Sequence, residues 1–197
     1  MKKILFVLLV SLILLSCSDE DADGDEGDLP FSTVYWKSDG NGFIQFSTND
    51  PNVHNFAFTY IFTNNNNQII FEIECKKNSG NRRKPFGMIF GAQDNQSFYS
   101  LIIDTEGFYS IWKYNNNYIV IKEWIKSERL NTGYGKSNNL KVIKNSSTFT
   151  VYLNDHQVHQ FTDSTINGNR IGYYVSIGSE EEESFPNNPV DVRFRQR

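Results

Sequence analysis

Short segments in which apolar and polar residues alternate, or in which aromatic residues are frequent, cover most of the chain after residue 55. The eleven segments are FAFTYIF, QIIFEIEC, FGMIFGA, FYSLIID, GFYSIWK, YIVIKEW, NLKVIK, TFTVYL, HQVHQF, RIGYYVSI and VDVRFR. Turn-forming residues separate them, such as NNNN at 64–67 and NNN at 115–117. No stretch after the first 30 residues keeps an apolar period of 3.6 residues over three turns. This pattern predicts an all-β fold, a two-sheet antiparallel β-sandwich.

The segments near the end of the chain show the alternation most clearly. TFTVYL at 148–153 and VDVRFR at 190–195 each place apolar side chains on one face and polar ones on the other. Between Leu153 and His156, the pair Asn154-Asp155 fits a two-residue hairpin, because both residues tolerate positive φ.

A second hairpin is predicted in FYSLIIDTEGFYSIW, residues 98–112, with Asp104 to Gly107 as its turn. This turn sets Ile103 opposite Tyr109 and Ser100 opposite Trp112, which sorts the side chains onto two faces. The first face is uniformly large and is predicted to be core: Tyr99, Leu101, Ile103, Tyr109 and Ile111. The second face mixes serines with large side chains: Phe98, Ser100, Ile102, Phe108, Ser110 and Trp112.

This mixed second face is typical of a surface that binds sugars. Pyranose rings stack on aromatic side chains, and their hydroxyls need small polar partners. In the next segment, strict alternation places Lys122 and Trp124 on the same side as Tyr118 and Val120, so both can join this surface. The predicted ligand-binding residues are Trp112, Phe98, Ser100, Ser110, Phe108, Trp124 and Lys122. The alternative is that loops of the sandwich cover these aromatic residues.

The first sixteen residues have the pattern of a secretory signal peptide. Two lysines precede an apolar run from Ile4 to Leu15, which is shorter than the roughly 20 residues that a membrane-spanning helix needs. The residues LLSC at 14–17 resemble the bacterial lipobox, which implies cleavage before Cys17 and acylation of this cysteine. Contact with the membrane is then expected through the lipid anchor alone. An ordinary secreted protein is the alternative.

Residues 17–29 are predicted to be the lipidated cysteine and an acidic tether. Residues 18–28 carry seven acids and nothing apolar larger than Ala22, so this run stays extended and solvated. The acidic run resembles the surface-export signal of some Gram-negative lipoproteins, and Ser18, in place of Asp, argues against retention in the inner membrane. The expected location is the bacterial outer membrane, with the domain exposed at the cell surface. A simple polar spacer is the alternative.

The charge of the chain argues against nucleic-acid binding, and the position of its second cysteine argues against a catalytic thiol. The chain has 19 Lys plus Arg and 23 Asp plus Glu, and the part from residue 30 to 197 holds 17 basic and 16 acidic side chains. A nearly neutral domain lacks the positive surface that phosphate backbones select, so nucleic acid is not an expected partner. Cys75 alternates with Ile69, Phe71 and Ile73, which predicts a buried structural thiol and not a nucleophile.

Three longer stretches carry a resemblance to a known family. GMIFGAQDNQSFYSLIIDTEGFYSIWK, NNLKVIKNSSTFTVYLNDHQVHQFTDS and GNRIGYYVS, in this order, resemble the concanavalin A-like lectin/glucanase jelly roll. The similarity is narrower to its versions in bacterial surface lipoproteins and in domains identified as 3-keto-disaccharide hydrolases. It covers roughly residues 70–177 and implies a jelly-roll domain over 30–197. These are strand-and-turn patterns, so they support a fold and not an activity.

A glycoside hydrolase of this fold needs a pair of carboxylates on one strand face, and Glu72 with Glu74 is the nearest candidate. The glucanase pattern has a further glutamate after the pair, whereas Cys75 and Lys76 follow here. The sequence therefore names no catalytic residue beyond these weak candidates.

No metal or other cofactor is expected. His54, His156 and His159 lack the spacing of metal ligands, and the acidic run 180–183 is read as a solvated loop, with calcium binding as the alternative. The sequence thus predicts a surface-anchored lipoprotein whose lectin-like domain binds carbohydrate without cleaving it. Three alternatives stay open: a glycoside hydrolase acting on oligo- or polysaccharide, a domain for protein interaction or adhesion, and a subunit with no ligand.

Overall fold

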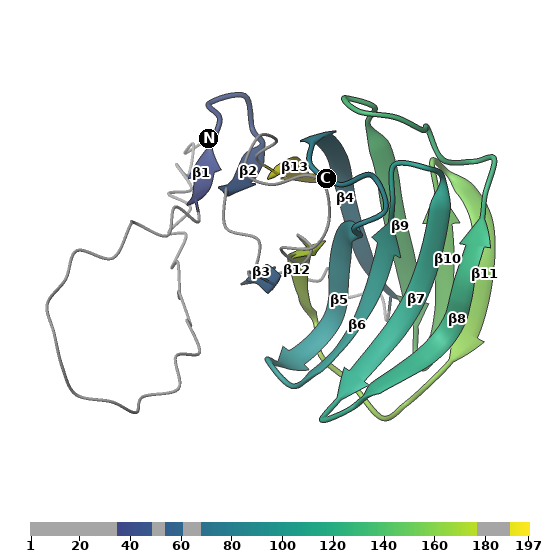
Figure 1. Ribbon diagram of the computed structural model, residues 1–197. Helices are drawn as coiled ribbons and strands as arrows, with labels where there is room; N and C mark the ends of the chain where they lie inside the picture. Colours follow the sequence, from purple (N-terminus) through teal and green to yellow (C-terminus); the bar gives the residue numbers. More distant parts are fainter. Residues whose placement is uncertain (1–34, 49–53, 61–67, 177–189) are drawn as a thin grey trace, which may run out of the picture. The chain divides into compact units, whose positions relative to one another are not determined.

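The computed structural model describes residues 35–48, 54–60, 68–176 and 190–197, which form thirteen strands and no helix (Figure 1). The seven-stranded sheet has the spatial order β1 (Tyr35–Ser38), β2 (Ile44–Thr48), β13 (Val190–Gln196), β4 (Gln68–Ser79), β9 (Asn138–Asn145), β10 (Thr148–Leu153) and β11 (His156–Thr162). The six-stranded sheet has the order β3 (His54–Tyr60), β12 (Arg170–Ser176), β5 (Phe86–Asp94), β6 (Ser97–Ile103), β7 (Phe108–Asn115) and β8 (Tyr118–Lys126). All pairings between neighbouring strands are antiparallel.

The predicted all-β, two-sheet antiparallel sandwich is confirmed. Each of the eleven segments recognised in the sequence coincides with one strand, from β3 to β13. The strands β1 and β2 were not recognised, because they are only four and five residues long and too short to establish a period. The described residues all lie in one compact unit, Ser32–Arg197, which contains its own core and is expected to fold by itself.

The signal peptide 1–16, Cys17, the tether 17–29 and the acidic run 180–183 lie outside the described residues. Within the described part of the chain, no helix has the length and apolarity of a membrane span.

One hydrophobic core joins the inner faces of the two sheets. Phe71 of β4 and Phe90 of β5 meet across the sandwich, with ring centroids 5.9 Å apart, and Phe149 of β10 lies 5.9 Å from Phe90. All three side chains are fully buried. Complete burial of one such side chain stabilises a fold by about 1.5–3 kcal/mol. Cys75 lies in the same core, where burial raises the pKa of its thiol, which confirms the buried, unreactive cysteine.

Three lysines of the described strands point inward and use their ammonium groups to hold loops: Lys77, Lys113 and Lys144, whose Nζ donates to Asn167 Oδ1 at 2.7 Å. Lys77 Nζ donates to the carbonyl oxygens of Asn81 and Lys84, at 2.5 and 3.0 Å, and burial lowers the pKa of Lys77 to about 7. Lys113 Nζ donates to Asp163 Oδ2 at 2.8 Å and is almost fully buried. Because loop oxygens and a carboxylate occupy them, these cations serve the fold and not a ligand site.

Both predicted hairpins have the expected geometry. In the first, Ser100 pairs with Trp112 and Ile103 with Tyr109, and Gly107 has a φ of 94°. Asp104 Oδ1 closes its turn by accepting the N–H groups of Glu106 and Phe108, both at 2.9 Å. In the second, Asn154 and Asp155 have φ values of 48° and 65°, as a two-residue turn between β10 and β11 requires.

Candidate functional site

The candidate site lies on the outer face of the six-stranded sheet, where β6, β7 and β8 run side by side (Figure 1). The inner face of this hairpin is core, as predicted: Tyr99, Leu101, Ile103, Tyr109 and Ile111 are all at most 4% exposed. The opposite face therefore points away from the other sheet. It carries the predicted ligand-binding side chains of β6 and β7.

Four aromatic side chains on this outer face form a continuous group, here called the aromatic cluster: Phe98, Trp112, Tyr114 and Tyr118. The ring centroids of Phe98 and Tyr114 are 5.2 Å apart, and those of Tyr114 and Tyr118 are 4.7 Å apart. The Tyr118 ring meets Trp112 edge-on at 6.1 Å. Exposure rises along the cluster, from 5% for Phe98 to 64% for Tyr118. Phe98 is thus the base of the cluster and Tyr118 its accessible end.

The base of the cluster is packed into the sheet surface. Phe98 contacts Ile89 and Ala92 of β5, and the rings of Tyr114 and Tyr174 cover this small apolar group. Burial, and then the electrostatic effect of Tyr118, raise the pKa of Tyr174. Tyr114 and Tyr174 thus lie at the sheet surface, packed against the buried side chains of Phe98, Ile89 and Ala92.

Trp112 carries an unused hydrogen-bond donor. Its side chain is partly buried, and its Nε1–H is shielded from solvent without an acceptor among the described residues. A buried donor without a partner costs about 1–3 kcal/mol.

The two serines on this face are less accessible than the sequence suggested. Ser110 is fully buried, and its hydroxyl donates to the backbone carbonyl of Lys122 at 2.7 Å. Ser100, opposite Trp112, is 7% exposed. The Ser110 hydroxyl therefore links β7 to β8. Ser100 is buried among larger side chains.

Strand β8 does not keep the strict alternation expected for it. Tyr118 and Val120 pair with Tyr114 and Trp112, but Lys122 pairs with Ile111, a residue of the core face. Two register shifts in the pairing of β7 with β8 cause this difference, because a bulge turns consecutive side chains to the same side. Lys122 is therefore separated from the row of Trp112, contrary to the expected alternation.

The remaining predicted residues lie at the other end of β7 and β8. Phe108 pairs with Lys126, whose Nζ is 5.9 Å from the centroid of the Phe108 ring. Trp124, two residues before Lys126, is 39% exposed. Phe108 and Trp124 are thus not among the rings that contact the aromatic cluster.

Polar loops border the exposed end of the aromatic cluster. The loops 93–96 and 115–117 lie side by side, because the Asn116 N–H donates to the Gln96 carbonyl at 3.2 Å. Their exposed side chains are mostly amides: Gln93, Asn95, Gln96, Asn115, Asn116 and Asn117. Such groups offer both donors and acceptors, which sugar hydroxyls require. Sequence reasoning selected neither these amides nor Tyr114 and Tyr174, although Tyr114 follows the two-residue spacing of Ser110 and Trp112.

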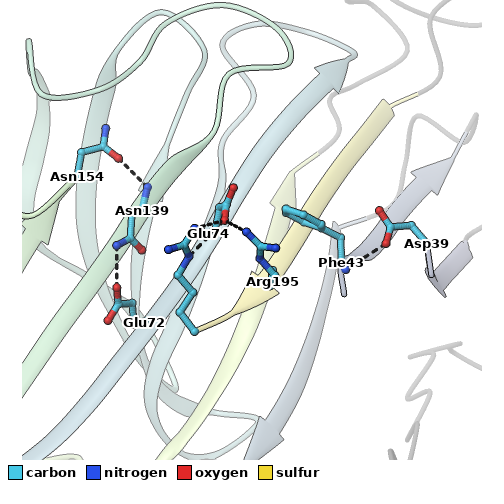
Figure 2. A network of polar contacts seen from close by, with 8 residues as sticks. Asp39, Phe43, Glu72, Glu74, Asn139, Asn154 and Arg195 are labelled. Atoms are coloured by element: carbon cyan, nitrogen blue, oxygen red, sulfur yellow. Dashed lines mark hydrogen bonds and ion pairs between the residues drawn. The ribbon is translucent and has the colours of Figure 1, made fainter. Parts of the chain in front are cut away.

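The carboxylates of Glu72 and Glu74 lie on the outer face of the other sheet, in a separate polar network (Figure 2). Glu72 Oε1 accepts a hydrogen bond from Asn139 Nδ2 at 2.7 Å, and Asn154 Oδ1 accepts the N–H of Asn139 at 2.7 Å. Glu74 Oε2 forms ion pairs with both Arg195 and Arg197.

Arg195 extends this network by lying 4.5 Å from the Phe43 ring centroid, and Asp39 Oδ1 accepts the N–H of Phe43 at 3.1 Å.

This network does not provide a general acid. Burial alone raises the pKa of Glu74, but hydrogen bonds from Arg197 and Arg195 outweigh this effect and lower the pKa to about 2. A glycosidase acid needs a raised pKa so that it is protonated near neutral pH. Glu72 and Glu74 therefore have the contacts of structural ion pairs, on the face opposite to the aromatic cluster.

Metal-ligating groups are not gathered anywhere in the described residues, where no three His, Cys, Asp or Glu side chains come together. His159 stacks with Phe161, and burial followed by the Lys122 charge lowers its pKa.

The fold is a concanavalin A-like jelly-roll sandwich, as the strand-and-turn motifs of the sequence implied. Three solved structures with this fold are similar to the chain. The carbohydrate-binding module CBM66 from Bacillus subtilis is 17% identical, with a TM-score of 0.51 over 83% of this chain and 89% of that one. The Bacillus licheniformis β-glucanase is 14% identical, with a TM-score of 0.52 over 89% and 88%. An alginate lyase of polysaccharide lyase family 7 is 10% identical, with a TM-score of 0.53 over 86% and 85%.

No family model matches the sequence, and no curated protein is similar to it at the level of sequence. At these identities the three structures establish the fold alone.

Proposed function

We propose that this domain binds a glycan on the outer face of its six-stranded sheet and does not cleave it. The observation that carries the proposal is the aromatic cluster, which ends in the exposed Tyr118 and contains the partly buried Trp112. Sugar rings stack on such aromatic faces while a few polar groups orient them. The amides of loops 93–96 and 115–117 supply these polar groups at the edge of the cluster.

The similar structures support a ligand of this class. One is a carbohydrate-binding module, one a β-glucanase and one an alginate lyase, and each name refers to a carbohydrate. Because the identities are between 10% and 17%, the ligand is inferred from the cluster and not from these relatives.

Binding is favoured over hydrolysis for a chemical reason. Retaining and inverting glycosidases need two carboxyl groups that flank the sugar, one of them protonated. Glu72 and Glu74 lie on the opposite sheet, and Glu74 is held ionised by two arginines. The side chains of β6, β7 and β8 that point outward beside Trp112 are aromatic, aliphatic or hydroxylic.

The test is a glycan array probed with the Ser32–Arg197 unit, followed by titration calorimetry with β-glucan and alginate oligosaccharides and with any array hit. Trp112→Ala and Tyr118→Ala are each expected to raise the Kd at least about tenfold, because each removes a stacking surface worth about 1.4 kcal/mol or more. Tyr152→Ala is the matched control, because Tyr152 is an aromatic residue on the outer face of β10 in the other sheet.

Unchanged affinity in both cluster variants, or no bound glycan at all, contradicts the proposal. Because Trp112 is partly buried, circular dichroism of each variant checks that the fold is kept, and the exposed Tyr118 provides the variant that costs the fold least. Release of reducing sugar from a bound glycan would favour the hydrolase alternative instead.

We also propose that the chain is a lipoprotein, acylated at Cys17 and anchored in the outer membrane with its domain facing the exterior. The LLSC sequence at 14–17 and the acidic run at 18–28 support this placement. An alternative role in protein contacts is favoured by one observation, the exposed apolar side chains of β8.

A further inference from the structure

Three loops at one end of the sandwich carry an excess of basic side chains (Figure 1). They are residues 80–85 between β4 and β5, 104–107 between β6 and β7, and 127–137 between β8 and β9. Together with Lys126, the last residue of β8, they are here called the basic loops. They hold six basic residues: Arg82, Arg83, Lys84, Lys126, Arg129 and Lys136. They hold three acidic residues: Asp104, Glu106 and Glu128.

The excess of positive charge is a property of this end of the sheet. At the opposite end of β6 and β7, residues 93–96 and 115–117 include one charged residue, Asp94. Within the basic loops, two of the three acids already have a role: Asp104 is buried and closes its turn, and Glu106 pairs with Arg83. Positive charge therefore dominates the accessible surface of the basic loops.

Hydrogen bonds connect the three loops to one another and to the strands. The Arg82 carbonyl accepts the N–H and the hydroxyl of Thr105, at 3.1 and 3.0 Å. The N–H of Ser127 donates to the Gly107 carbonyl at 2.9 Å, and the Tyr134 hydroxyl donates to the carbonyl of residue 80. Because the backbone of these loops is held in place, a ligand that binds their side chains loses less entropy in ordering them.

The cations nearest to the β6–β7 turn are available to a ligand. Arg82 lies over the Tyr134 ring, with 5.2 Å between its guanidinium carbon and the ring centroid, and Lys126 Nζ lies 5.9 Å from the Phe108 centroid. Both side chains are exposed, and in the described part of the chain their partners are these rings and no carboxylate. Arg83 pairs with Glu106 but is still 81% exposed. Contact with a ring orients a cation and leaves its N–H groups free to donate.

The basic loops and the aromatic cluster lie at opposite ends of the same strands. Phe108, Trp112 and Tyr114 alternate along the outer face of β7, and Lys126 lies over Phe108 next to the turn. From Phe108 to Tyr114 the strand covers about 20 Å, at roughly 3.3 Å per residue. A chain of several linked sugar rings that stacks on the cluster and follows β7 therefore reaches Lys126 and the basic loops.

We propose that the glycan bound by the aromatic cluster is an acidic polysaccharide, whose carboxylate or sulfate groups pair with Arg82, Arg83 and Lys126. This inference rests on the proposed function, because it names the class of glycan for the same surface. The N–H groups of a guanidinium match two oxygens of a carboxylate or sulfate group. An acidic glycan neutralises the excess positive charge of the basic loops, whereas a neutral glycan leaves it without a partner.

Titration calorimetry on the Ser32–Arg197 unit compares two matched pairs of ligands at low salt. The first pair is alginate oligosaccharides and their carboxyl-reduced, neutral form, and the second is dextran sulfate and dextran. The acidic member of at least one pair is expected to bind about tenfold more tightly or better, because several exposed ion pairs contribute together. The pair that shows the difference identifies carboxylate or sulfate as the acidic group. Salt at about 0.5 M is expected to remove most of the difference, because it screens exposed charges.

Variants of the cations test which side chains read the charge. Arg82→Ala and Lys126→Ala are each expected to raise the Kd for the acidic ligand about threefold, and together about tenfold, without changing the Kd for its neutral form. Lys126→Arg keeps the charge and is expected to keep the affinity. Lys76→Ala is the control, because Lys76 Nζ lies 4.9 Å from the Phe43 ring centroid on the outer face of the other sheet.

Glu106→Gln tests the same idea in the opposite direction. It removes the carboxylate that pairs with Arg83 and so competes with the ligand. The affinity for the acidic ligand is therefore expected to rise about twofold, with no change for the neutral form. Circular dichroism of each variant checks that the fold is kept.

Equal affinity for the acidic and neutral members of both pairs overturns this inference. The proposed function then still stands, provided that Trp112→Ala and Tyr118→Ala weaken binding. Loss of affinity in Arg82→Ala and Lys126→Ala without any effect of the two cluster variants overturns both, since the basic loops would act alone. Equal binding of an oligodeoxythymidine of the same charge overturns the inference as well, because the surface would then select charge and not an acidic sugar.

Discussion

At the scale of single residues, the ionised groups of this protein are mainly used to hold strands and loops together. Glu74 is the clearest case: its side chain is only 11% exposed, and its Oε2 atom accepts hydrogen bonds from both Arg195 and Arg197. The arginines are on the C-terminal strand or directly after it, next to β4. One carboxylate thus ties the last residues of the chain to the centre of the sheet.

Glu74→Gln is expected to reduce the free energy of unfolding at pH 7 by about 1–3 kcal/mol, because the charge-assisted bonds are lost. The folded-state pKa of about 2 is below the ordinary value of 4.5, so this stabilisation is complete above about pH 4.5 and is lost as the pH falls towards 2. Urea unfolding at pH 7 and at pH 3 measures both effects.

In the variant, the fall in stability between pH 5 and pH 2 is therefore expected to be shallower than in the unaltered protein. Glu106→Gln is the control, because Glu106 pairs with Arg83, whose side chain is 81% exposed, and its loss is expected to change stability by less than about 0.5 kcal/mol. Equal losses in the two variants would contradict the structural role of Glu74.

At the scale of elements, the hairpin of β6 and β7 shows what local sequence decides and what it does not. The turn residues Asp104 to Gly107 set its register, and the alternation of side chains then sorted core from outer face correctly. The turn itself is buried, since Asp104 and Thr105 are 7% and 5% exposed. The loop that follows β8 covers it: Gly133 N–H donates to the Thr105 carbonyl at 2.8 Å. No pattern in the sequence of the hairpin itself indicates that a distant loop covers its turn.

Gly107→Ala is expected to destabilise the protein by about 2 kcal/mol or more. A Cβ atom at this position would lie 2.9 Å from Thr132 Cγ2, and the φ of 94° is already unfavourable for a side chain. Thermal unfolding followed by circular dichroism measures the loss.

Gly133→Ala is the matched control for this turn. Gly133 has the same φ of 94°, but nothing lies within 4 Å of its added Cβ, so this variant carries the backbone strain without the contact. It is expected to be less destabilised than Gly107→Ala, and Thr132→Ser combined with Gly107→Ala is expected to recover part of the difference. Identical losses in both single variants would show that the contact with Thr132 is unimportant.

Strand β8 marks the limit of periodicity as a guide. Strict alternation put Lys122 on the side of Trp112, but the bulge moved it to the side of Ile111. A bulge depends on how two strands fit together over their length and not on the residues of one strand alone. For this reason the sequence selected Trp112 correctly as a member of the outer face but did not identify which side chains surround it.

At the scale of the whole molecule, the two outer faces of the sandwich have different chemistry. The six-stranded sheet carries the aromatic cluster, and the seven-stranded sheet carries the ion pairs of Glu72 and Glu74. The carboxylates and the aromatic cluster therefore do not share one surface. The separation leaves the aromatic face as the candidate binding surface.

The predicted lipid anchor at Cys17 determines where the whole molecule is located. Cys17→Ser is expected to abolish the incorporation of labelled palmitate and to release the protein from the membrane fraction of the cells that express it. Cys75→Ala is the control, because the Cys75 thiol is buried in the core and is expected to have no part in labelling. Protease treatment of intact cells then tests exposure at the surface. Palmitate incorporation that persists in Cys17→Ser would contradict the anchor.

The sequence by itself determined the class of fold, the strands from β3 to β13, the register of the β6–β7 hairpin and the two-residue turn between β10 and β11. These features follow from local rules, namely the two-residue period of strands and the φ values that turn residues tolerate. Only the tertiary structure decided which outward-facing side chains gather. It brought Tyr114, Tyr118 and Trp112 together, buried Ser110 and separated Glu74 from the aromatic face. These outcomes depend on strand order, bulges and packing between residues far apart in the chain, which no single segment encodes.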